Sequence, residues 1–166
     1  MVTVNLAAAL TSLMVAALFA SGYLASRDEK MGLTAAGFLV LAMASASAVI
    51  APRSLLPPLL YPLGYVLIVA ARLGKRVAPT PLIVVYPRVL LDAAATGLAV
   101  AAFAPSPSLA VRIGGALLAI SHILDVAVPA VRLLAMLLRG AALLLVSGSI
   151  VARSMPRLPS EEAEEA

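Results

Sequence analysis

Several residue types are missing from this 166-residue chain, and each absence excludes a class of chemistry. The chain has no cysteine, so disulfides, thiolate metal sites and cysteine nucleophiles are excluded. His122 is the single histidine, which rules out a haem held by two histidines of one chain. Tryptophan and glutamine are also absent and Asn5 is the sole asparagine, a composition typical of thermophilic sources and equally of GC-rich codon usage.

Charge is scarce as well. Charged residues make up 12% of the chain and hydrophobic residues 63%, with a mean hydropathy of +1.07. An average soluble domain has about 25% charged residues, so nearly all of this chain is expected to sit in lipid. The net charge of +4 does not indicate a nucleic-acid partner, because the basic residues stand singly and form no patch. The predicted partner is therefore the lipid bilayer.

Apolar runs of about 20 residues, each long enough to cross a bilayer, fill almost the whole chain. They predict an all-α integral membrane protein, a polytopic bundle of six transmembrane helices. We place the spans at residues 2–26, 31–51, 54–72, 82–103, 108–128 and 131–152, within one transmembrane domain of residues 1–152. Residues 153–166 are polar and acidic and are expected to form a disordered tail.

The third span is expected to be the least regular. Pro57, Pro58 and Pro62 fall in its first half, and a proline inside a helix removes a backbone donor and kinks or breaks the helix. We therefore expect an extended or broken entry, followed by a regular helix from about Leu63.

The fourth predicted span carries Arg88 and Asp92 in the middle of an apolar stretch. A charge at that depth costs roughly 2.5–3.5 kcal/mol on insertion scales. Because the two residues are four positions apart, they lie on one helix face and can neutralise each other there. Arg139 is an alternative partner for Asp92, and either pair could simply fix the register of the helices.

The fifth span contributes His122 and Asp125, whose spacing fits a proton relay or a hydrogen-bonded pair. With a rise of about 1.5 Å per residue, all these polar residues fall within the same half of the bilayer. Arg132, nearer the end of its span, is expected to anchor the helix at the interface. The predicted ligand or ion pathway consists of Arg88, Asp92, His122, Asp125 and Arg139.

Templates of intramembrane enzymes match the chain poorly, so a membrane enzyme ranks third, after a transporter and an accessory subunit. The G-x-S-G of rhomboid-type proteases is absent, and Asp92 and Asp125 lack the G-x-G-D frame of intramembrane aspartyl proteases. Arg132 and Arg139 are too far apart for a voltage sensor. One histidine and two membrane aspartates fall short of ordinary ligand sets, so no metal or other cofactor is predicted.

The intramembrane charges favour a transporter, a channel or a transporter subunit that binds or moves a small polar solute or ion. With His122 neutral, the charges of the five pathway residues cancel, and protonation of His122 leaves one excess positive charge, which favours an anionic or proton-coupled cargo. The alternative is a non-catalytic accessory or assembly subunit, in which the charges are structural pairs between helices. A homo-oligomer or a partner membrane subunit fits either function. A polar cavity at these residues would favour transport, and a packed core the accessory subunit.

The orientation in the cell membrane follows from the basic residues near the span ends. Both termini are predicted to be extracytoplasmic, because one side collects Arg27, Lys30, Arg72, Lys75, Arg76 and Arg132 and the other Arg53, Arg153 and Arg157. The second and fifth spans also share a weak pattern of glycines followed by a proline, Pro52 and Pro129. This pattern indicates a three-plus-three repeat, which would be inverted if consecutive spans alternate in direction.

Overall fold

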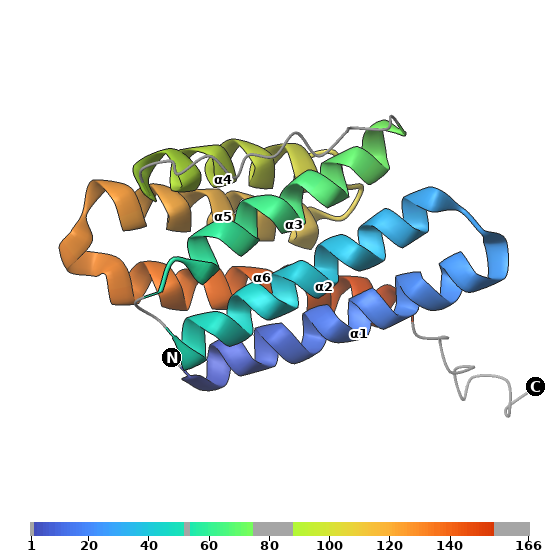
Figure 1. Ribbon diagram of the computed structural model, residues 1–166, viewed down its shortest axis with the longest axis horizontal. Helices are drawn as coiled ribbons and strands as arrows, with labels where there is room; N and C mark the ends of the chain where they lie inside the picture. Colours follow the sequence, from blue (N-terminus) through green and yellow to red (C-terminus); the bar gives the residue numbers. More distant parts are fainter. Residues whose placement is uncertain (1, 52–53, 75–87, 155–166) are drawn as a thin grey trace, which may run out of the picture.

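The computed structural model describes residues 2–51, 54–74 and 88–154, and within these ranges all regular structure is helical (Figure 1). The predicted all-α fold class is thereby confirmed. A short 3-10 helix, η1 (Pro129–Val131), precedes the last long helix. The α-helices are α1 (Val2–Ser26), α2 (Glu29–Ile50), α3 (Leu56–Leu73), α4 (Arg88–Phe103), α5 (Leu109–Ala127) and α6 (Arg132–Ser154).

Five of these helices, α1, α2, α3, α5 and α6, are long and apolar enough to cross a membrane. Helix α4 has 16 residues, about 24 Å of helix, which is shorter than a hydrocarbon core of about 30 Å. Residues 82–87 of the fourth predicted span lie outside the described residues. Arg153 and Ser154, which we assigned to the tail, form the last turn of α6, and the rest of the tail also lies outside them.

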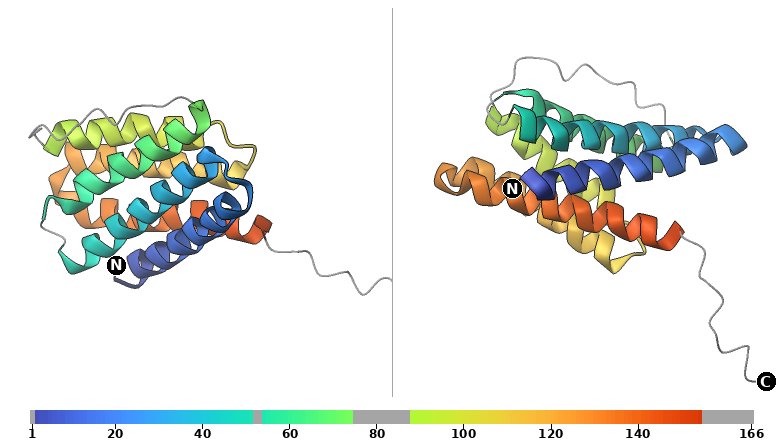
Figure 2. Two further views of the ribbon diagram at one scale, coloured as in Figure 1. Left: turned by 45° about the vertical axis from the view of Figure 1, so that its right-hand side comes forward. Right: turned by 90° about the horizontal axis from the view of Figure 1, so that it is seen from below.

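The helices form a closed ring, in which each packs against its neighbours in sequence and α6 packs against α1 (Figures 1 and 2). Helices α1 and α6 run parallel, because two contacts between them follow the same order in both helices. Asn5 of α1 lies against Gly140 of α6, and further along both helices Thr11 Oγ1 is 2.7 Å from Ser147 Oγ. Short connections make hairpins of α1–α2, α2–α3, α4–α5 and α5–α6. Consequently α1, α3, α4 and α6 point one way and α2 and α5 the other.

Two topological predictions are wrong for this arrangement. We expected a repeat of three helices to be inverted, but α4–α6 have the same directions as α1–α3. We also expected both termini on one side, but Val2 and Ser154 lie at opposite ends of the bundle. Both errors came from assuming that α3 and α4 form a hairpin, whereas they are parallel neighbours, so that α3 ends and α4 begins at opposite ends of the bundle. We call these ends N-terminal, where α1 begins, and C-terminal, where α6 ends.

Glycines bring the backbones together in one hairpin of each half. A Cβ on Gly37 of α2 would lie 2.9 Å from the Gly64 carbonyl oxygen of α3. A Cβ on Gly114 of α5 would lie 3.0 Å from the Ala142 carbonyl oxygen of α6 and 2.6 Å from Val146 Cγ2. The two hairpins are therefore held by the same kind of close backbone contact, which in membranes depends on small residues.

The buried positions of α1–α3 recur in α4–α6 at one constant spacing within each pair of helices. In α1 and α4 the matched buried residues include Asn5 and Asp92, Ala8 and Ala95, Ser12 and Ala99, Val15 and Ala102. In α2 and α5 they include Gly37 and Gly114, Leu41 and Leu118, Ser45 and His122, Ala48 and Asp125. In α3 and α6 they include Pro58 and Met136, Tyr61 and Arg139, Gly64 and Ala142, Ile68 and Val146. The two groups of three helices thus bury equivalent faces.

Helix α3 is regular from Leu56, so the expected broken entry is not found. Pro57 and Pro58 occupy its first turn, where a backbone N–H has no partner within the helix and its loss costs little. Pro62 lies inside the helix, and both it and Pro58 are buried against the rest of the ring. The prolines therefore start the helix and fill the core.

Candidate functional site

The buried charged side chains of the described helices, together with His122, gather near the N-terminal end of the ring. Asp92 is in the second turn of α4, His122 and Asp125 are in the last two turns of α5, and Arg139 is in the third turn of α6. Tyr61 is in the second turn of α3. Because α3, α4 and α6 begin at this end and α5 finishes there, these turns lie at the same level of the bundle.

A row of hydrogen bonds links Asp92 of α4, His122 of α5 and Tyr65 of α3. His122 Nδ1 is 2.9 Å from Asp92 Oδ1, and His122 Nε2 is 3.4 Å from Tyr65 Oη. The imidazole also meets the rings of Tyr61 and Tyr65 edge-on, at centroid distances of 5.6 and 6.0 Å. His122 and Asp92 are 0% and 1% exposed, so a proton gained or lost here must be compensated by neighbouring charges or dipoles.

Arg139 connects this row to the second carboxylate. Its Nη2 is 3.3 Å from Asp125 Oδ2 and 3.9 Å from Asp92 Oδ1. The same guanidinium donates from Nε to Ser121 Oγ and from Nη2 to the Ser121 carbonyl oxygen, both at 3.3 Å. It also lies over the Tyr61 ring, 5.2 Å from the centroid, in a cation–π contact. This buried cation is thus held by carboxylates, hydrogen bonds and an aromatic face, as a charge in a low-dielectric interior requires.

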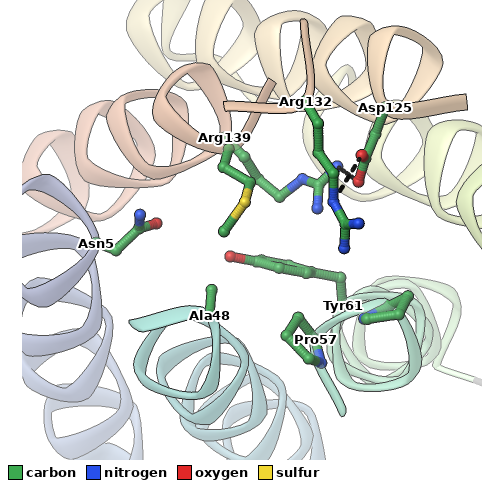
Figure 3. A pocket seen from close by; sticks show the side chains of 9 residues that line it. Asn5, Ala48, Pro57, Tyr61, Asp125, Arg132 and Arg139 are labelled. Atoms are coloured by element: carbon green, nitrogen blue, oxygen red, sulfur yellow. Dashed lines mark hydrogen bonds and ion pairs between the residues drawn. The ribbon is translucent and has the colours of Figure 1, made fainter. Parts of the chain in front are cut away.

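A small pocket reaches this network from the N-terminal end (Figure 3). Arg132, whose side chain is 36% exposed, stands at its mouth with Nε 3.6 Å from Asp125 Oδ1. The space open to the centre of a water molecule is about 10 Å³, which is close to what one ordered water needs. The lining residues are Asn5, Ala48, Pro57, Pro58, Tyr61, Asp125, Arg132, Met136 and Arg139.

Towards the C-terminal end the interior of the ring is apolar. Tyr65 meets Phe103 edge-on at 6.0 Å between centroids, and Phe38 meets Phe103 at 6.4 Å. Leu41 and Leu118 are fully buried in the same core. The polar network is therefore reached from one end and closed at the other by packed side chains.

The structure brings together four of the five predicted pathway residues, Asp92, His122, Asp125 and Arg139. Arg88 opens α4, but its side chain lies outside the described residues. Among the described side chains, Asp92 contacts His122 at 2.9 Å and the expected partner Arg139 at 3.9 Å, and Asp125 contacts Arg139 at 3.3 Å. The position of each residue along its helix predicted that these residues lie at a similar depth in the bundle. It could not predict which helices pack side by side.

Sequence reasoning missed the aromatic and amide members of the site. Tyr61 and Tyr65 are one turn apart within the proline-containing third span, and that spacing was the available signal. Asn5 was visible as the only asparagine of the chain, in an otherwise apolar run. Arg132 was expected to be an interfacial anchor, and it also contacts Asp125 at the pocket mouth.

The site has the chemical groups for binding a small ion and for passing protons. It presents two carboxylates, two guanidinium groups, one imidazole and two phenols within one connected set. Within the described ranges, no group of three or more His, Asp or Glu side chains could hold a metal ion. Comparison of the chain with protein-family models, with curated proteins and with solved structures finds no match. The geometry of the site must therefore carry the functional argument.

Proposed function

We propose that this protein is a multi-pass membrane transporter, built from two parallel three-helix halves, that moves a small polar solute or ion together with protons. The halves are α1–α3 and α4–α6. In this proposal the buried network of Asp92, His122, Asp125 and Arg139 is the pathway, and Tyr61 and Tyr65 complete it.

The observation that carries the proposal is that the pocket lies between the halves and is walled by equivalent positions of both. Its lining contains three matched pairs, Ala48 with Asp125, Tyr61 with Arg139 and Pro58 with Met136. A site on the axis between two repeats is where a relative movement of the repeats changes access. Parallel repeats related by an axis along the membrane normal occur in several transporter folds.

The present arrangement fits one state of such a cycle. The pocket meets the network from the N-terminal end, while Phe38, Tyr65 and Phe103 fill the interior towards the C-terminal end. Movement of one half against the other would separate these aromatic rings, because Phe38 and Tyr65 belong to the first half and Phe103 to the second. Transport then requires the opposite state, in which the aromatic layer opens and the pocket closes.

The basic residues give the orientation that we propose. Of the basic side chains whose positions are described, those near the C-terminal end are Arg27, Lys30, Arg72, Arg112 and Arg153. Near the N-terminal end, apart from the buried Arg139, the described basic residue is Arg132. Cytoplasmic loops carry the excess of Lys and Arg, so we infer that the C-terminal end is cytoplasmic and that the pocket faces the outside.

One observation favours a second candidate, an accessory or assembly subunit. The pocket has room for about one water, and the charges contact one another within a single chain. In that case the network would only hold the helices in register. Loss of the charges would then affect stability alone.

Proton flux in reconstituted liposomes tests the proposal. Purified protein is placed in vesicles that contain a pH-sensitive dye, and a pH gradient is imposed while a potassium ionophore clamps the membrane potential. We expect the gradient to decay faster with the protein than in protein-free vesicles. Asp92→Asn should abolish the difference, because it removes the carboxylate that contacts His122.

The matched control is Ser149→Ala in α6. Among the described residues, Ser149 Oγ donates a hydrogen bond within its own helix, to the Leu145 carbonyl oxygen at 2.6 Å, so this variant should transport like the wild type. A correctly folded wild-type protein that leaves the decay rate at the protein-free level under every ionic condition would refute transport and favour the accessory subunit.

A further inference from the structure

Asp125 lies between two guanidinium groups at the pocket mouth (Figure 3). Its Oδ2 is 3.3 Å from Arg139 Nη2, and its Oδ1 is 3.6 Å from Arg132 Nε. The carboxylate thus occupies the place that a small monovalent anion would take between the same two cations. Asp125 lines the pocket, whereas Asp92 lies deeper against His122 and is not part of the lining.

The opposite wall of the pocket carries no charge. The equivalents of Asp125 and Arg139 in the first half are Ala48 and Tyr61, which line the pocket as well. Asn5 adds a neutral amide from α1. Among the described lining residues, the charged groups that an entering ion would meet therefore lie on α5 and α6, and the sum of their charges decides which ion is accepted.

We propose that the pocket binds a small monovalent anion, of the size of a carboxylate group or a halide, and that Asp125 couples this anion to one proton. This inference rests on the proposed transport function and names its cargo and coupling residue. While Asp125 is ionised, it occupies the guanidinium groups itself. Once it takes up a proton from the outside solution, an anion replaces its negative charge.

Charge balance sets the stoichiometry. The side chains of Asp92, Asp125, Arg132 and Arg139 together carry no net charge when all are ionised. Protonation of Asp125 brings this sum to +1, and one bound monovalent anion returns it to zero. A net charge inside a membrane protein is costly, so the doubly loaded state, with one proton and one anion, is favoured over either singly loaded state. The step forms one O–H bond and requires no redox partner.

Every charged or titratable group described around Asp125 has a place in this scheme. Arg132 and Arg139 of α6 contact it directly, and Asp92 of α4 shares Arg139 with it at 3.9 Å. His122 of α5 and Tyr61 of α3 lie on the inner side, where His122 is bound to Asp92 and Tyr61 lies under Arg139. Among the described residues Asp125 is the one acidic side chain that lines the pocket, so proton uptake there changes the balance between it and the two arginines of the lining.

The experiment compares anion-driven proton movement in liposomes for the wild type and for Asp125→Asn. Vesicles with an internal pH-sensitive dye receive an inward gradient of chloride, nitrate or formate, with gluconate as a bulky control anion. For the wild type we expect internal acidification with the small anions and none with gluconate. Asp125→Asn should still exchange labelled chloride but should lose the acidification, because its amide cannot carry the proton.

Arg132→Gln should weaken the anion dependence, shifting half-maximal acidification to a higher chloride concentration. Its matched control is Arg112→Gln, since Arg112 is exposed on α5 towards the opposite end of the bundle. This control should behave like the wild type. An equal loss in both arginine variants would show that the effect is not due to the pocket and would overturn the anion site.

A binding measurement keeps the inference testable if a variant does not reconstitute. In detergent at acidic pH, chloride should raise the melting temperature of the wild type, and this increase should disappear in Arg132→Gln. Proton flux that is the same with chloride and with gluconate would overturn the anion coupling and leave proton transport intact. No flux under any condition would instead overturn the proposed function itself.

Discussion

The first half of the molecule, α1–α3, and the second, α4–α6, bury equivalent positions but fill them with different chemistry. Ser45, Ala48 and Tyr61 in the first half correspond to His122, Asp125 and Arg139 in the second. Asn5 corresponds to Asp92. The spacing of buried positions is set by helix packing, which both halves share, whereas the side chains at the axis are free to differ. One half therefore provides neutral walls and the other the charges.

The equivalence of the two halves requires that corresponding helices run in the same direction across the membrane. The first prediction therefore tests this topology and has the largest expected effect. Single cysteines at Thr3 and Ser154, both exposed and near opposite ends, should label from opposite sides of the membrane. Leu73→Cys should label with Ser154→Cys, since α3 and α6 end at the same end. The chain has no native cysteine that could interfere.

A membrane-impermeant maleimide applied to intact cells measures this directly. We expect Thr3→Cys to react from outside and the other two variants to react only after permeabilisation. Labelling of Thr3→Cys and Ser154→Cys from the same side would restore the inverted arrangement and contradict the parallel halves.

The next largest effect is expected where the halves differ most, at Arg139 and its counterpart Tyr61. Arg139→Met leaves buried carboxylates without their shared cation and should cost about 3–5 kcal/mol. Tyr61→Phe removes one hydroxyl, 3.2 Å from Ser45 Oγ, and should cost about 1 kcal/mol. Unfolding in detergent, followed by circular dichroism, measures both free energies.

The double variant Asp125→Leu with Arg139→Met sharpens this prediction. It should recover much of the lost stability, because an apolar pair often replaces a buried ion pair without net cost. Recovered stability without proton flux would agree with a transport role of the pair. A double variant as unstable as the sum of the single ones would contradict the direct pairing of Asp125 and Arg139.

Smaller effects than that of Arg139→Met are expected at the glycine contacts that the two halves share. Gly37→Ala and Gly114→Ala place a methyl group 2.9 and 3.0 Å from a facing carbonyl oxygen, so both should cost about 1–3 kcal/mol through overpacking. Gly97→Ala and Gly148→Ala are the controls, because an added Cβ meets nothing within 4 Å. These should be neutral or stabilising by up to about 1 kcal/mol, since alanine favours helix.

The same unfolding experiment ranks the four glycine variants. If Gly37→Ala and Gly114→Ala differ as much from each other as from the controls, the two hairpins are not equivalent. In that case the α2–α3 and α5–α6 hairpins would not be equivalent at their close glycine–backbone contacts.

Much of the site could be expected from the sequence, because polar residues in long apolar runs are few. Asp92, His122, Asp125 and Arg139 stand out in this way, and the helix rise places them at one level of the bundle. Arg139 was an expected partner of Asp92 and lies 3.9 Å from it, but the contact of Asp92 on α4 with His122 on the neighbouring helix α5 could not be predicted. A helical period gives the face of a residue, but the neighbour of that face depends on how all six helices close the ring.

The sequence by itself determined that the chain is helical and apolar enough for a membrane, and which charges must be buried. These are local properties, because the hydropathy of a 20-residue run depends only on the run itself. Only the tertiary structure decided that α4 runs parallel to α3, and hence that the halves are parallel and the pocket lies between them. The direction of a helix depends on which ends the chain joins and on the packing that closes α6 onto α1, and neither is written in any single segment.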